Sequence, residues 1–270
     1  MNCFVKNVVA ESQTAPEIKT LIPDAGLRRR MSRILKTAVA TAVECAGGVG
    51  APEQPDAIIT ATGLGLLTDS ERFLRNMIAE NEQLLNPTPF IQSTFNTVGG
   101  QIAMMGRNHG YNVTYVNRSQ GFEDAMLDAM MRFADRESRT ALVGAFDEQT
   151  PAQHRIMERM GFWRRCEECE GAVFALLTAE PSAHALAEVA VLDFPARPLA
   201  AEACLRQSAA TPRAVLLTEE PRQTGLSPVA AAQRFAAGVR AITEGAEEVI
   251  LYNEHRGRRP SVMVLRCIGR

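Results

Sequence analysis

The alternation of strand-forming and helix-forming segments is the feature that most constrains the fold of this chain. Short apolar segments predict strands at residues 2–9, 55–62, 112–116, 140–145, 172–177, 188–192, 213–217, 249–252 and 262–267. Longer segments with apolar residues at helical spacing predict helices at residues 24–46, 69–85, 98–105, 122–135 and 229–242. This alternation favours an α/β fold of mostly parallel sheets, with helices between and outside them.

The order of elements occurs twice, the second time in shortened form. Residues 115–177 predict a strand, a loop, an alanine-rich helix, a strand, a long connection and a strand. Residues 216–266 predict the same order with a short turn in place of the long connection. The order of elements repeats, but the residues themselves do not. We therefore expect two related halves packed face to face. We assign residues 1–180 to the first half and 181–270 to a reduced C-terminal half that completes the same domain.

Charge and hydropathy exclude several classes of function. The formal net charge of −2 gives no basic field for nucleic acid or membrane binding. No apolar run reaches the roughly 18 residues that a membrane-spanning helix needs. The segment from Met1 to Ser12 has too short an apolar stretch for a signal peptide. We therefore expect a cytoplasmic protein without a membrane span.

The cysteines give no sign of a metal centre. Cys166 and Cys169 form a single CxxC motif, whereas a structural zinc site needs a second pair of ligands nearby. Glu167 and Glu168 lie between them and would raise the thiol pKa values rather than lower them. We expect a polar connector before a strand, and no metal site.

The turn from Asn117 to Gly121 is the first candidate for chemistry, because it joins a predicted strand directly to a predicted helix. The N-terminus of a helix stabilises a thiolate or an oxyanion, so such turns hold nucleophiles. In one hypothesis Ser119 is the nucleophile of a hydrolase or acyltransferase, although the turn keeps only the second glycine of the G-x-S-x-G motif. Its acid and histidine partners would come from Asp147, His154, His184, Asp193 and His255.

A resemblance supports a different hypothesis. The run from Thr94 to Glu148 resembles the β-ketoacyl synthase N-terminal domain, a thiolase-like family. Residues 93–103, with sequence STFNTVGGQIA, resemble the helix that precedes the family's nucleophile strand, and residues 142–148, LVGAFDE, resemble its strand ending in Asp-Glu. The resemblance covers residues 2–178 and is thin from Glu188 onward, where about one strand–helix unit is missing.

The catalytic residues of that family are absent at the matching positions. The family's cysteine lies three residues before the glycine of the turn, and here that position is Arg118 in the run Arg118, Ser119, Gln120 and Gly121. Arginine cannot be acylated, and its permanent charge would occupy the pocket of the thiolate. The family's two histidine motifs are missing too, and we interpret His255 as a solvent-facing turn residue.

The resemblance therefore implies a subunit that is not an enzyme by itself. Cysteine-less members of the family act as chain length factors, which pair with an active ketosynthase in polyketide, polyene or fatty-acid-like biosynthesis. The implied partners are a ketosynthase subunit and an acyl carrier protein, whose phosphopantetheine belongs to the carrier, so we expect no cofactor in this chain. A homodimer that serves as a scaffold for carrier proteins is a further alternative.

The resemblance also implies where the partner binds. The strand 112–116, with Thr114 and Val116, would pair across the two-fold axis, and the helix that follows Phe95 would border the partner's pocket, with candidate residues Phe95, Asn96, Thr97, Met104 and Met105. Methionines adapt to irregular surfaces and suit a tunnel wall, although ordinary core packing is the alternative for each of Met104, Met105, Met126, Met130 and Met131. An unpaired strand 112–116 would make the isolated chain prone to aggregation.

Two short arginine-rich segments are candidates for carrier-protein docking. Arg28, Arg29 and Arg30 lie at the start of a predicted helix, and Arg258 and Arg259 lie on a predicted turn. Acyl carrier protein is acidic, so basic patches could attract it. A solvated helix face is the alternative.

Overall fold

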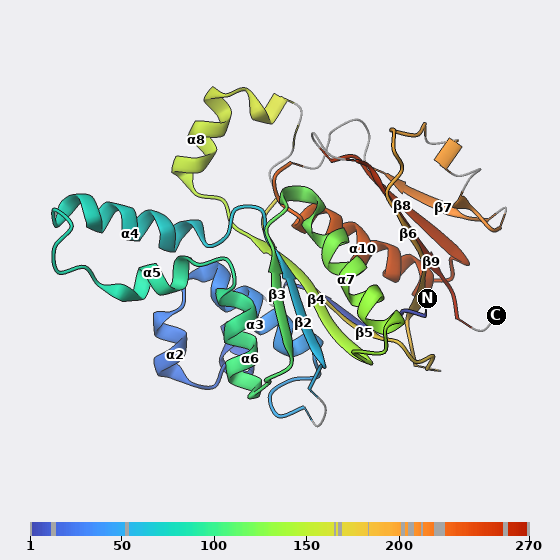
Figure 1. The fold of residues 1–270 in the computed structure, drawn as a ribbon, viewed down its shortest axis with the longest axis horizontal. Helices are drawn as coiled ribbons and strands as arrows, with labels where there is room; N and C mark the ends of the chain where they lie inside the picture. Colours follow the sequence, from blue (N-terminus) through green and yellow to red (C-terminus); the bar gives the residue numbers. More distant parts are fainter. Residues whose placement is uncertain are drawn as a thin grey trace.

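The computed structural model describes residues 2–11, 15–51, 54–164, 166, 169–182, 184–200, 203–204, 208–211, 213–218, 225–255 and 259–268. Within these residues, nine strands form one sheet in the order β3-β2-β4-β5-β1-β6-β9-β8-β7 (Figure 1). None of the helices among them is long and apolar enough to cross a membrane.

The first five strands form one end of the sheet. They are β1 (Phe4–Ala10), β2 (Ala57–Ala61), β3 (Tyr111–Tyr115), β4 (Thr140–Asp147) and β5 (Gly171–Thr178). β2 pairs in parallel with β3 and β4, and β5 pairs antiparallel with β4 and β1. The helices of this part are α1 (Ala15–Leu21), α2 (Ala25–Arg30), α3 (Arg33–Cys45), α4 (Leu67–Ala79), α5 (Pro87–Ser93), α6 (Thr97–Gly106), α7 (Gly121–Ala134) and α8 (Pro151–Arg159).

The remaining strands repeat this pairing pattern. They are β6 (Ala187–Asp193), β7 (Val215–Thr218), β8 (Glu248–Asn253) and β9 (Ser261–Arg266), with α10 (Val229–Thr243) before β8. β7 pairs in parallel with β8, β8 pairs antiparallel with β9, and β9 pairs antiparallel with β6. The corresponding pairs in the first half are β2 with β4, β4 with β5, and β5 with β1. The described residues contain no second-half equivalent of β3. The prediction of two related halves, the second one shortened, is confirmed.

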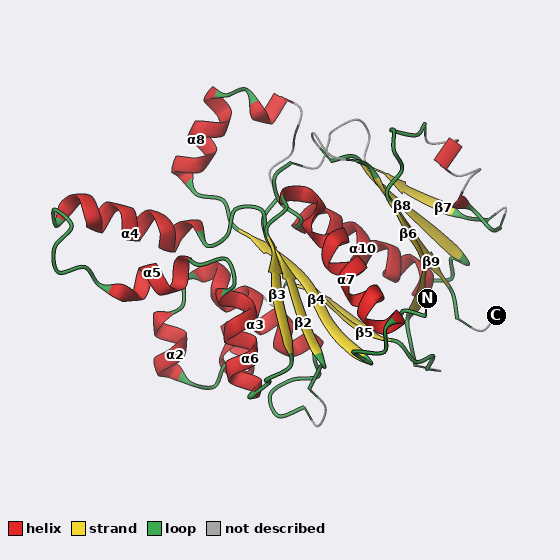
Figure 2. Ribbon diagram, viewed as in Figure 1, coloured by secondary structure: helices red, strands yellow, loops and turns green. Residues whose placement is uncertain are grey.

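The two halves of the sheet enclose a central layer of two helices (Figure 2). α7 and α10 lie beside each other, and the rings of Phe122 and Phe235 are 5.5 Å apart. Apolar residues of both helices and of both halves of the sheet form one buried cluster. α3 covers the outer face of the first half, where Leu35 belongs to the same cluster as Leu142. The halves are therefore packed face to face through α7 and α10.

The strand directions differ from the prediction. Among the described residues, three strand pairings are parallel and five are antiparallel, so the sheet is mixed rather than mostly parallel. β1 and β6 also pair antiparallel, with Val5 opposite Ala187, and this pairing joins the two halves into one sheet. Periodicity identifies a strand but carries no information about its direction, which depends on the path of the connections.

Helix boundaries show two further differences. The predicted helix 24–46 is interrupted at Met31 and Ser32, which have extended backbone angles and separate α2 from α3. The short helices α5 and α8 were not predicted, although each begins at a proline after a capping residue. Asn86 accepts a hydrogen bond from the Thr88 amide, and Thr150 caps α8 in the same way. Proline at the first helical position is a start signal for such helices.

Candidate functional site

The turn between β3 and α7 keeps the geometry of a strand-to-helix elbow. β3 ends at Tyr115, a 3₁₀ turn spans Arg118–Gln120, and α7 begins at Gly121. Arg118 has a φ of 55°, in the left-handed region that a side chain rarely adopts. Its side chain is exposed at the N-terminal end of α7. A β-carbon at Gly121 would lie 3.3 Å from the β-carbon of Ala61, so the turn passes close to the end of β2.

Behind the exposed arginine, the next side chain of the turn points into the protein. Ser119 is only 2% exposed, and its hydroxyl oxygen lies 3.2 Å from Nδ1 of His255. His255 follows β8 and is 3% exposed. The interpretation of His255 as a solvent-facing turn residue is therefore wrong. The end of β8 lies against the elbow, a contact between distant segments that the local sequence does not reveal.

The other imidazole nitrogen faces a buried carboxylate on α7. Nε2 of His255 lies 3.2 Å from Oε1 of Glu123 and 3.1 Å from the hydroxyl of Ser261. Oε1 of Glu123 also accepts hydrogen bonds from Asn253 at 2.7 Å and from Ser261 at 2.8 Å. Burial acts to raise the pKa of Glu123, but the adjacent His255 and these hydrogen bonds outweigh it and lower the pKa. The carboxylate is held in its charged form.

Ser119, His255 and Glu123 thus form a continuous hydrogen-bonded chain of hydroxyl, imidazole and carboxylate. Of the partners considered for Ser119 in the sequence, His255 is the one that contacts it. Glu123 was not among the candidates from the sequence, although it lies only four residues after Ser119, in the first turn of α7. The remaining candidates have other neighbours: His154 stacks on Trp163, Asp193 accepts a hydrogen bond from the Phe194 amide, and His184 is exposed.

Asp147, at the end of β4, holds the loop after β2. Its carboxylate accepts hydrogen bonds from the Thr62 hydroxyl at 2.6 Å and from the amides of Gly63 and Leu64 at 2.9 Å. Burial raises the pKa of Asp147 to about 6, against these hydrogen bonds, which lower it. A β-carbon at Gly63 would lie 3.4 Å from the Arg118 α-carbon, so this loop borders the elbow.

Glu148 acts on the same loop. Its two carboxylate oxygens accept hydrogen bonds from the Thr68 amide and the Thr68 hydroxyl, each at 2.8 Å. Asp147 and Glu148, the Asp-Glu pair noted in the sequence, therefore fix the connection from β2 to α4 at both of its ends. Their role here is to position backbone next to the elbow.

Among the strands that the structure describes, β3 is the outermost at its end of the sheet, and one side of it pairs with none of them. A groove of about 690 Å³ lies beside it, lined by Ser93, Thr94, Phe95, Asn96, Gly100, Asn112, Val113 and Thr114. The structure thus brings the sequence candidates Phe95, Asn96 and Thr114 together. Thr97 lies next to them, where its hydroxyl bonds to that of Thr94 at 2.9 Å, and Val116 is 46% exposed just beyond the strand.

Comparison with known proteins identifies the family of this chain. The family model described as β-ketoacyl synthase, N-terminal domain, matches residues 5–214. The chain belongs to this family. Comparison with curated protein sequences gives no match.

Solved structures of ketosynthases and chain length factors share the fold. A chain of the ishigamide ketosynthase/chain length factor superposes with a TM-score of 0.73 at 14% identity, covering 100% of both chains. A chain of a type II PKS acyl-carrier protein in complex with its ketosynthase gives 0.72 at 12% identity, covering 99% of both. A ketosynthase in complex with its chain length factor from Xenorhabdus doucetiae gives 0.60 at 13% identity, covering 98% of this chain and 99% of that one.

The methionines of this β-ketoacyl synthase family member are divided among different surroundings. Met126 and Met130 belong to the central core. Met105 packs against the cluster around α3, away from the groove beside β3. Met104 and Met131 are 71% and 51% exposed. Met126 and Met130 are therefore ordinary core residues, the alternative given for them from the sequence.

The basic segments and the CxxC motif also have defined places. Arg29 and Arg30 are exposed on α2, and Arg28 is half-buried; each donates a hydrogen bond to a backbone carbonyl upstream. Arg259 is exposed, whereas Arg258 lies outside the described residues. Cys166 is buried and Cys169 is half-buried. In the described part of the chain, no group of three or more His, Cys, Asp or Glu side chains could hold a metal ion.

Proposed function

We propose that this chain is a non-catalytic ketosynthase-like subunit, a chain length factor, that pairs with an active ketosynthase. The observation that carries the proposal is the elbow. Its strand-to-helix geometry is retained, but Arg118 occupies the left-handed position of the turn, and Ser119, His255 and Glu123 fill the buried space behind it. A family member that keeps the fold without a nucleophile can contribute surface and pocket walls, which need no reactive group.

The unpaired edge of β3 is where the ketosynthase subunit would bind. An edge strand offers free backbone donors and acceptors to a strand of another chain. Phe95, Asn96, Thr97, Thr114 and Val116 lie at or beside this edge and would face the partner, with Met104 on the adjoining α6 and Met105 on its inner side. Residues at this edge would shape the space available to the acyl chain in the partner's tunnel.

The acyl carrier protein would dock on the arginines of α2. Arg29 and Arg30 are exposed, and a basic patch in a chain of net charge −2 is a local attraction for an acidic partner. Arg259 is a second exposed candidate, together with Arg258. The phosphopantetheine would arrive on the carrier, and the pathway would be cytoplasmic synthesis of a polyketide, polyene or fatty-acid-like chain.

Co-expression with an active ketosynthase from the same organism tests the proposal. We expect a heterodimer in size-exclusion chromatography, and acyl products of defined length only when both chains are present. Val116→Lys, which places a charge next to the β3 edge, should abolish the heterodimer, while Val49→Lys, an exposed site elsewhere, should not. A chain that stays monomeric beside the ketosynthase and leaves its products unchanged would contradict the proposal, and a stable homodimer would favour the carrier-scaffold alternative.

A serine hydrolase or acyltransferase is the second candidate, because Ser119, His255 and Glu123 follow one another in the order of a catalytic triad. The burial of the Ser119 hydroxyl places this candidate second. Hydrolysis of p-nitrophenyl esters and acyl thioesters by the purified chain, lost in Ser119→Ala, would support it. Equal background rates for the two proteins would exclude it.

A further inference from the structure

Three helices of the structure bury almost none of their apolar side chains. α4 is an amphipathic helix of 13 residues, yet its single buried residue is Asp69. In α5 the buried residue is Pro89, and in α8 it is Gln153. These three helices, together called the arm, project beyond the β3 end of the sheet (Figure 1). In the isolated chain the apolar faces of the arm are left in contact with water.

The exposed apolar residues of the protein are concentrated on this side. Of the 14 large apolar side chains that are exposed among the described residues, eight lie on the arm or the loops next to it: Leu74, Ile78, Leu84, Phe90, Ile91, Phe95, Ile156 and Met160. Three more, Met104, Val116 and Met131, lie just after β3 or on α6 and α7, the helices that pack against β3. Exposed apolar residues gathered on one side of a protein mark an interaction site.

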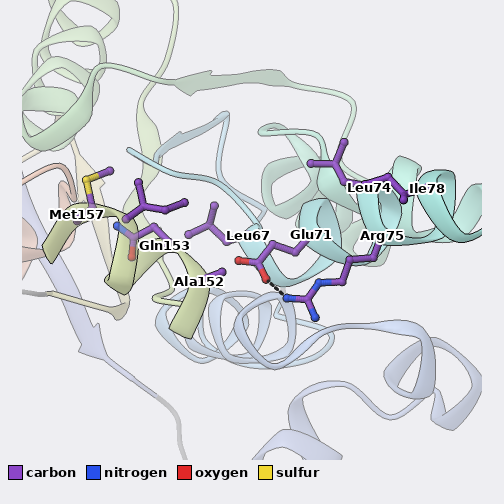
Figure 3. Close-up of a pocket in the computed structure, with 9 residues that line it drawn as sticks. Leu67, Glu71, Leu74, Arg75, Ile78, Ala152, Gln153 and Met157 are labelled. Atoms are coloured by element: carbon purple, nitrogen blue, oxygen red, sulfur yellow. Dashed lines mark hydrogen bonds and ion pairs between the residues drawn. The ribbon is translucent and has the colours of Figure 1, made fainter. Parts of the chain in front are cut away.

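The arm also contains a shaped groove. It has a volume of about 380 Å³ between α4 and α8, with Leu67, Leu74 and Ile78 on one wall and Ala152 and Met157 on the other (Figure 3). Ile156 of α8 also lines it. The ion pair of Glu71 and Arg75, 3.0 Å apart, lies at its rim. Such grooves between two helices accommodate an apolar helix or loop of another protein.

Gln153 adds a polar feature to the groove. Its side chain is 7% exposed, lines the groove, and has no hydrogen-bond partner for either Oε1 or Nε2. A buried amide without partners is unfavourable, so α8 carries a local destabilisation at the wall of the groove.

The β3 edge is too short to form a stable protein–protein interface by itself. Five residues of about 3.3 Å each make an edge about 17 Å long. A stable interface covers about 800 Å² on each partner, which a single strand edge of this length does not provide. The arm adjoins the edge, because the groove beside β3 is lined by both Phe95, which follows α5, and Thr114 of β3.

We infer that the arm is part of the ketosynthase-binding surface, and that the groove between α4 and α8 holds an apolar segment of the ketosynthase subunit. The inference rests on the proposed function for the identity of the partner. One partner covers β3, Phe95 and the arm as a continuous surface. Its inserted segment buries Leu74, Ile78 and Ile156.

The double substitution Ile78→Lys/Ile156→Lys tests the inference. Both side chains are largely exposed, at 80% and 57%, so the isolated chain should fold as before. Binding is measured by surface plasmon resonance against the purified ketosynthase that forms the heterodimer with the wild-type chain. We expect the dissociation constant to rise at least tenfold, because two charges enter an apolar interface. The matched control Val49→Lys, at a site 56% exposed outside the arm, should bind as wild type.

The possible results separate this inference from the proposed function. If Val116→Lys abolishes the heterodimer while the double variant binds as wild type, the arm is not in the interface and the inference is overturned, but the proposed function stands. If the wild-type chain binds no ketosynthase, the proposed function fails and the inference fails with it. If the double variant disrupts a homodimer and leaves ketosynthase binding intact, a second copy occupies the groove and the inference is again overturned.

Discussion

Nδ1 of His255 lies 3.2 Å from the hydroxyl oxygen of Ser119, although 136 residues separate them in the sequence. Ser119 belongs to the elbow before α7, and His255 follows β8 in the second half of the sheet. With Glu123 they form a buried polar network that connects the two halves. The elbow is tied to the end of β8 by hydrogen bonds.

Removal of the histidine should destabilise the fold strongly. His255→Ala leaves the buried Glu123 carboxylate without the imidazole nitrogen that lies 3.2 Å from it. We therefore expect a loss of about 3 kcal/mol in the free energy of unfolding. Urea unfolding at neutral pH measures it. In a double variant, His255→Ala/Glu123→Gln, the buried charge is removed as well, and the loss should be smaller. A loss of less than about 1 kcal/mol for His255→Ala would show that the network contributes little.

Asp147 should make stability depend on pH in the acidic range. Its pKa is raised from 3.8 to about 6 by burial. Because the folded protein binds this proton more tightly than the unfolded chain, the contribution of Asp147 is present below pH 3.8 and is lost as the pH rises through about 6. Between about pH 4 and about pH 7.5 the loss should be about 2 kcal/mol.

The measurement for Asp147 is the difference in unfolding free energy between the wild-type chain and Asp147→Asn at both ends of that range. All other titrating groups are common to the two proteins, so their contributions cancel. The stability of the wild-type chain relative to the variant should fall by this amount as the pH rises. A difference that stays constant with pH would contradict the assignment of the raised pKa to Asp147.

A thiol placed at the elbow should be activated by α7. In Arg118→Cys the thiol lies at the N-terminal end of the helix, which stabilises a thiolate. Met131→Cys is the matched control, since it is exposed on the C-terminal part of the same helix. We expect iodoacetamide to modify the thiol at 118 about tenfold faster at neutral pH, as followed by mass spectrometry. Equal modification rates for the two variants would show that the N-terminal end of α7 does not stabilise a thiolate at position 118.

Charge reversal on α2 should weaken binding of an acidic carrier protein. For Arg29→Glu/Arg30→Glu we expect about a tenfold loss of affinity at low salt, which shrinks as the ionic strength rises. Fluorescence anisotropy with a labelled acyl carrier protein measures this. Arg107→Glu, at an exposed arginine at the end of α6, is the control. An equal loss per charge in that variant would indicate a general effect of net charge rather than docking at α2.

Local sequence signals sufficed for the long elements of the core. Short apolar runs predicted β2 and β4, in which nearly every residue is buried. Helical spacing predicted α7 and α10, because each of these helices buries one apolar stripe. The arm was the least predictable part. The short helices α5 and α8 have few buried residues and therefore a weak periodic signal, and the predicted helix 69–85 ended earlier, at Ala79.

The sequence by itself determined the order of strands and helices, the shortened second half and the absence of a cysteine at Arg118. These follow from residue identity and from contacts between neighbours three or four positions apart. Only the tertiary structure shows the mixed strand directions, the burial of His255 and the contacts of His255 with Ser119 and Glu123. Those features depend on which distant segments come together, and the periodicity of a segment gives its buried face but does not specify what lies against that face.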